Sequence, residues 1–119
     1  MSRNDLTGRV REAVGLTAVL RPGDQQDSRA PGGAITVELC GSWHHAGTCR
    51  WPHHTGVDAQ AERWTIRTLL AVEPAERKEV IARVRRALDQ DPGWALLSFE
   101  ETAVTENERP HATRLATEH

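Results

Sequence analysis

The second half of the chain constrains the fold most, because its apolar pattern predicts a strand, a helix and another strand in succession. Apolar and polar residues mostly alternate over 63–72, which is typical of a strand. Pro74 suits the first turn of a helix, and residues 80–88 carry an apolar stripe opposite charged side chains. The tripeptide Asp-Pro-Gly at 91–93 ends that helix, and 94–104 follows as the last strand.

Residues 34–40 give the clearest strand pattern in the first half of the chain. Apolar and polar residues alternate there, so Ile35, Val37 and Leu39 are expected to face the core. Cys40 would then lie on the opposite, more polar face of the strand.

Four other segments complete the predicted order of elements. Apolar residues at helical spacing predict a short amino-terminal helix that ends at Gly15, and a strand follows at 16–21. Residues 22–33 are rich in glycine, proline and polar residues, which predicts a flexible loop. Residues 105–119 are polar, contain a proline and lack periodicity, which predicts a frayed or disordered tail.

These elements predict a single α+β domain over residues 1–104. We expect a small antiparallel or mixed sheet of three to four strands with one main helix packed on one face. A chain of 119 residues is long enough for one modest core. The strand–helix–strand unit would form a right-handed crossover if its strands are parallel, and a split arrangement of the ferredoxin type is compatible with the order.

The segment 40–61 joins two of the predicted strands and concentrates the reactive side chains of the chain. Its stretch CGSWHHAGTCRWPHHTG holds both cysteines, four of the six histidines and two of the four tryptophans. Loops longer than about 12 residues are uncommon in compact domains and are often functional. We therefore place the candidate site in this loop.

The cysteines and histidines of this loop form two Cys-x3-His pairs, each with an adjacent histidine as an alternate. Two thiolates and two imidazoles are the tetrahedral set that a structural zinc ion accepts. A straight strand would carry the first cysteine away from its histidine, so the site requires a bend at Gly41. The expected cofactor is zinc, in a structural or sensory role, and the predicted ligands are Cys40, His44, His45, Cys49, His53 and His54.

Three other interpretations of the loop stay open. The first is a non-metal module for binding a protein or small ligand, with Trp43 and Trp51 as its anchors. The second is a small thiol enzyme in which Cys49 is the nucleophile, activated by a neighbouring histidine and by Arg50. The third is a disulfide between Cys40 and Cys49, which would close a loop of about ten residues.

Charge and hydropathy narrow the expected partners and location. The formal net charge of −2 gives no basic excess for binding nucleic acid or a membrane surface. No apolar run approaches the ~18 residues of a membrane span, and the first dozen residues lack the apolar core of a secretory signal. We therefore expect a cytoplasmic protein, and its arginine-rich, tyrosine-free composition suggests a bacterial source.

Overall fold

The computed structural model describes residues 11–24, 27–40, 51–90 and 92–117, which form a four-stranded sheet with helices on both faces. The predicted α+β class is therefore confirmed. In chain order the elements are β1 (Glu12–Pro22), α2 (Ala30–Cys40), β2 (His53–Ala59), β3 (Trp64–Val72), the 3-10 helix η1 (Pro74–Glu76), α3 (Arg77–Asp89), β4 (Trp94–Thr102) and α4 (Arg109–Thr117).

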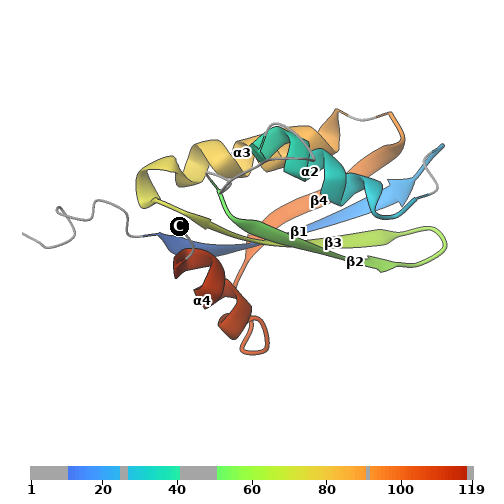
Figure 1. Ribbon diagram of the computed structural model, residues 1–119. Helices are drawn as coiled ribbons and strands as arrows, with labels where there is room; N and C mark the ends of the chain where they lie inside the picture. The colour runs from blue at the N-terminus through green and yellow to red at the C-terminus, as the bar shows by residue number, and fades with distance from the viewer. Residues whose placement is uncertain (1–10, 25–26, 41–50, 91, 118–119) are drawn as a thin grey trace, which may run out of the picture.

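The sheet has the strand order β2-β3-β1-β4, and every neighbouring pair is antiparallel. β3 and β4 both run antiparallel to β1, so they are parallel to each other with β1 between them. Helix α3 connects β3 to β4, and α2 precedes β2 in the matching position. This is the split arrangement of the ferredoxin type. Figure 1 shows α2 and α3 over one face of the sheet and α4 against the other.

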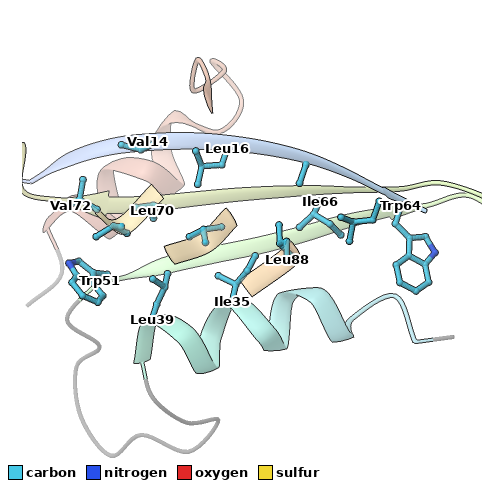
Figure 2. Close-up of a cluster of buried hydrophobic side chains, with 14 of the residues drawn as sticks. Val14, Leu16, Ile35, Leu39, Trp51, Trp64, Ile66, Leu70, Val72 and Leu88 are labelled. Carbon is cyan, nitrogen blue, oxygen red and sulfur yellow. The ribbon is translucent and has the colours of Figure 1, made fainter. Parts of the chain in front are cut away.

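The main core lies between the sheet and the helices α2 and α3. The register places Val14 of β1 opposite Leu70 of β3, and Ala18 opposite Ile66, with all four side chains buried. Figure 2 shows side chains from the sheet and from α2 meeting in this layer. The other buried members are Leu16, Leu20, Ile35, Leu39, Trp51, Trp64, Val72, Val80, Val84, Leu88 and Trp94.

The strand–helix–strand unit predicted for the second half of the chain is confirmed. Pro74 opens the short helix η1, and α3 ends at Asp89, just before the Asp-Pro-Gly tripeptide. The indole of Trp94 donates a hydrogen bond of 2.7 Å to the carbonyl oxygen of Leu88. This bond ties the start of β4 to the last turn of α3, and the Trp94 side chain is buried.

The strand predicted over 34–40 is wrong, because these residues form most of helix α2. Ile35 and Leu39 are one helical turn apart and both are buried, whereas Val37 is 42% exposed. A spacing of four residues puts two side chains on the same side of either a strand or a helix, so those two positions fit both structures. The predicted flexible loop is also shorter than 22–33, since α2 begins at Ala30 and tolerates Pro31 in its first turn.

Two further predictions near the amino-terminal half are wrong. Strand β1 begins at Glu12, so Gly15 lies inside a strand and does not end a helix, while residues 1–10 lie outside the described part of the chain. The segment 40–61 is also not a loop throughout, because β2 occupies residues 53–59 and pairs with β3. This strand has few apolar residues, so the hydrophobic pattern did not identify it.

The tail predicted for 105–119 contains helix α4, which packs on the sheet face opposite to α2 and α3. Ala112 and Leu115 of α4 are buried, and Leu115 forms a second apolar cluster with Leu69 and Ala71 of β3. Two buried side chains in nine residues are too few for a clear periodic signal in the sequence.

Alanine substitutions in α2 should distinguish the helix from the predicted strand. Ile35→Ala should lower the free energy of unfolding by about 2–5 kcal/mol, because Ile35 is fully buried. Val37→Ala should change it by less than about 0.5 kcal/mol, because Val37 is largely exposed. Urea denaturation of both variants measures the difference, and equal losses would contradict the helix.

Candidate functional site

The adjacent histidines His53 and His54 begin β2, and strand alternation directs their side chains to opposite faces of the sheet. His53 faces α2: its Nδ1 donates to the carbonyl oxygen of Trp51 at 3.0 Å, and its Nε2 lies 3.1 Å from Oγ1 of Thr36. The ring of His54 instead lies 4.4 Å from the ring of His111 in α4, measured between centroids. The two neighbours in sequence therefore belong to different sites.

A pocket of about 270 Å³ opens beside His54, between β2, β3 and α4. This volume is close to the lower limit of about 300 Å³ for small-molecule sites, so the pocket suits a small ligand. Its lining combines two imidazoles, an amide, an ion pair and one apolar side chain. The lining residues are His54, Gly56, Arg67, Leu69, Asn107, Glu108 and His111.

One wall of the pocket is an ion pair between Arg67 of β3 and Glu108, which precedes α4. Nε and Nη2 of Arg67 donate to the two carboxylate oxygens of Glu108, each at 2.8 Å. The guanidinium also donates to the hydroxyls of Thr17 and Thr102 and to the carbonyl oxygen of Ala103. Arg67 therefore joins β3 to β1, β4 and α4, and its donors are occupied within the protein.

The side chain of Arg67 crosses the sheet directly over Gly15 of β1. A Cβ atom at Gly15 would lie 2.5 Å from Nη2 of Arg67 and 2.7 Å from the carbonyl oxygen of Thr102. These distances are too short for any side chain, so glycine is required where the guanidinium passes. The residue that the sequence predicted to end a helix instead makes room for the ion pair.

Glu108 also begins α4 through reciprocal hydrogen bonds with Thr105. The Thr105 amide donates to Oε1 of Glu108 at 2.9 Å, and the Glu108 amide donates to Oγ1 of Thr105 at 3.3 Å. This is a capping box, whose sequence signature is Thr-x-x-Glu. The signature at 105–108 indicates a helix, whereas the polar composition of 105–119 predicts a tail.

The contacts of Glu108 also change its acidity. The hydrogen bonds from Arg67, aided by those from Thr105, lower the pKa of the Glu108 carboxyl from 4.5 to about 2. The hydrogen bonds to Glu108 raise the pKa of the Arg67 guanidinium above its usual value. Both groups therefore stay charged at neutral pH, and the wall of the pocket carries a neutralised pair rather than a net charge.

Cys40, at the last position of α2, is disulfide-bonded, and the described residues contain no free cysteine. The only other cysteine of the sequence is Cys49, which lies outside the described residues. Of the alternatives predicted for Cys40, the disulfide is the state found. In this state Cys40 does not supply the thiolate that the predicted zinc site of two cysteines and two histidines includes.

Trp51 was predicted to anchor a partner, but its side chain is only 6% exposed and belongs to the core. Its indole Nε1 donates to Oε1 of Glu76 at 3.0 Å, and the guanidinium carbon of Arg83 lies 5.1 Å from the ring centroid. Figure 2 shows Trp51 beside Leu39 at the end of α2. The ring closes this end of the core and presents little surface to a partner.

The remaining predicted site residues lie outside the described part of the chain. They are Trp43, His44, His45 and Cys49, together with the bend required at Gly41. Within the described residues, no group of three or more histidine, cysteine, aspartate or glutamate side chains is arranged to hold a metal ion. The zinc site of segment 40–54 therefore stays a prediction.

No protein-family model matches the chain, and no curated protein matches its sequence. None of the helices in the described ranges is long and apolar enough to cross a membrane. Among the residues that the structure describes, the pocket beside His54 brings together side chains from which we argue a function.

Replacing Glu108 should give a stability loss that depends on pH. The folded-state pKa of about 2 lies below the usual 4.5, so the carboxylate stabilises the fold above pH 4.5 and loses this effect as the pH falls toward 2. Glu108→Gln should lower the free energy of unfolding by at most about 3 kcal/mol at pH 7. Urea denaturation at pH 7 and near pH 2.5 should show a smaller difference from wild type at low pH, while Glu106→Gln serves as the exposed control.

Reduction of the disulfide should lower stability. Cys40→Ser should reduce the free energy of unfolding by about 2–3 kcal/mol if the bond closes the loop to Cys49. Thiol alkylation followed by mass spectrometry should label both cysteines only after reduction. Rapid labelling before reduction would contradict the disulfide.

Proposed function

We propose that this chain is a small ligand-binding domain whose site is the pocket between β2, β3 and α4. The observation that carries the proposal is the convergence of side chains from separate elements on one opening of about 270 Å³. His54 comes from β2, Arg67 and Leu69 from β3, and His111 from α4. Such convergence of a few polar groups beside an apolar side chain is typical of small-molecule sites.

The lining indicates the chemistry of the ligand. The imidazoles of His54 and His111 and the amide of Asn107 can each donate and accept hydrogen bonds. The charges of Arg67 and Glu108 neutralise each other, so this pair does not favour a charged ligand over a neutral one. We therefore propose a small polar ligand that is recognised by hydrogen bonds and packs against Leu69.

Gly56 supports the proposal, because neither its backbone nor its packing requires glycine. Its φ lies outside the left-handed region, and no atom comes within 4 Å of the position that a Cβ would occupy. A side chain at this position would enter the open space of the pocket. The absence of a side chain at Gly56 therefore keeps the pocket accessible.

The other interpretations of the sequence stand as weaker proposals. Zinc binding through Cys40 and a thiol enzyme based on Cys49 both require reduced cysteines, whereas Cys40 is disulfide-bonded. A binding module that uses Trp43 and Trp51 would depend on Trp43, because Trp51 is buried. The disulfide also favours an oxidising compartment over the cytoplasm that the sequence suggests.

Filling the pocket should abolish ligand binding without unfolding the protein. The probe is a library of polar fragments of about a dozen non-hydrogen atoms or fewer, screened by amide chemical-shift changes in the ¹⁵N-labelled protein. We expect binding fragments to shift the signals of His54, Gly56 and His111. Gly56→Phe should remove these changes, because its ring would occupy the pocket.

Val57→Phe is the matched control, since it adds a ring at the next residue, which faces the other side of β2 and is 39% exposed. This variant should bind the same fragments as wild type, and both variants should keep the thermal unfolding midpoint within a few degrees. Fragments that bind Gly56→Phe as well as wild type would reject the pocket as the site. A library without any binder at these three residues would reject it as well.

A further inference from the structure

The two imidazoles at the mouth of the pocket come from elements that lie far apart in the sequence. His54 is the second residue of β2, and His111 lies in the first turn of α4. Their ring centroids are 4.4 Å apart and the ring planes are inclined at 44°. Helix α4 is held at this place by Glu108, three residues before His111, through its ion pair with Arg67. The juxtaposition of the two rings is therefore fixed by the fold.

Imidazoles that converge from two separate elements are typical metal ligands. Zinc binds histidine nitrogen at ~2.0–2.1 Å, so two nitrogens on one tetrahedral ion lie roughly 3.3 Å apart. The observed ring centroids are 4.4 Å apart, so binding of one ion by both rings requires a rotation of the side chains. His54 is exposed and His111 half-buried, so an ion can reach them from solvent.

We propose that His54 and His111 bind a zinc ion at the mouth of the pocket. The ion would have two protein ligands, and its other positions would be open to water, to the amide oxygen of Asn107 or to the pocket ligand. The inference rests on the proposed function, because it places the ion where that ligand would bind. Of the six zinc ligands predicted from the sequence, only His54 belongs to this new pair.

The disulfide favours this pair over the cysteines as the site of metal binding. Thiolates bind zinc more tightly than imidazoles in most mixed sites, but a disulfide-bonded Cys40 offers none. His53 is directed elsewhere, because its ring nitrogens contact Thr36 and the carbonyl of Trp51. Glu108 is committed to Arg67, so it does not compete as a ligand.

Zinc titration of the oxidised, tag-free protein tests the proposal. Isothermal titration calorimetry in a non-coordinating buffer should give about one zinc per chain, with weaker affinity than a four-ligand structural site. Zinc should also shift the side-chain ¹⁵N signals of His54 and His111. His54→Gln and His111→Gln should each weaken binding by at least about tenfold, and magnesium should not bind.

Two control variants separate this site from the one predicted by the sequence. His53→Gln and the double variant His44→Gln/His45→Gln should both bind zinc as wild type does. Loss of binding in the double variant with retention in His111→Gln would overturn the proposal, as would a wild-type protein that binds no zinc. Circular dichroism of each variant confirms that the fold is retained.

The metal proposal and the pocket proposal can fail separately. Fragment binding that is unchanged in His111→Gln, together with no zinc binding in wild type, would keep the pocket and reject the metal. Zinc binding that requires both histidines, with no fragment bound in the presence or absence of zinc, would keep the metal site and reject the small-ligand function.

Discussion

The ion pair between Arg67 and Glu108 organises the outer face of the sheet. The guanidinium starts on β3, passes over Gly15 of β1, reaches Thr102 of β4 and binds Glu108, directly before α4. Without this pair, α4 would be held on the sheet mainly by the small cluster around Leu115. The pocket exists only where α4 overhangs β2 and β3, so its shape depends on the same pair.

The sequence predicts the fold well where one periodicity excludes the other. The mostly alternating residues at 63–72 favour a strand and the apolar stripe at 80–88 favours a helix, and both elements are found. Prediction fails at 34–40, because Ile35 and Leu39 suit a strand and a helix equally and burial against α3 decides between them. It fails at α4 because the decisive signal was the capping box at Thr105 and Glu108, and not hydropathy.

The candidate site was predictable only in part. The sequence indicated His54 through its place in a segment rich in reactive residues, and His54 lines the pocket. It did not indicate His111, which is 57 positions away and lies in a segment predicted to be disordered. Long-range pairing of this kind depends on the strand order and on the docking of α4, and neither can be read from local spacing. The adjacent residues His53 and His54 show that closeness in sequence does not ensure a shared site. In a loop both side chains could face the same ligand, but in strand β2 they point to opposite faces of the sheet.

Helix α4 has a further consequence for the energetics of the molecule. It follows the last strand of the sheet, and its described contacts with the sheet include the ion pair of Glu108, the ring of His54 and a few apolar side chains. An element attached in this way can open locally while the main core stays folded. Opening would remove Glu108 and His111 from the pocket together. Any ligand that contacts both β2 and α4 would therefore stabilise the closed state, by an amount that grows with the ligand concentration relative to its dissociation constant. A ligand in the pocket would then slow amide hydrogen exchange in α4, which lies on the sheet face opposite the main core.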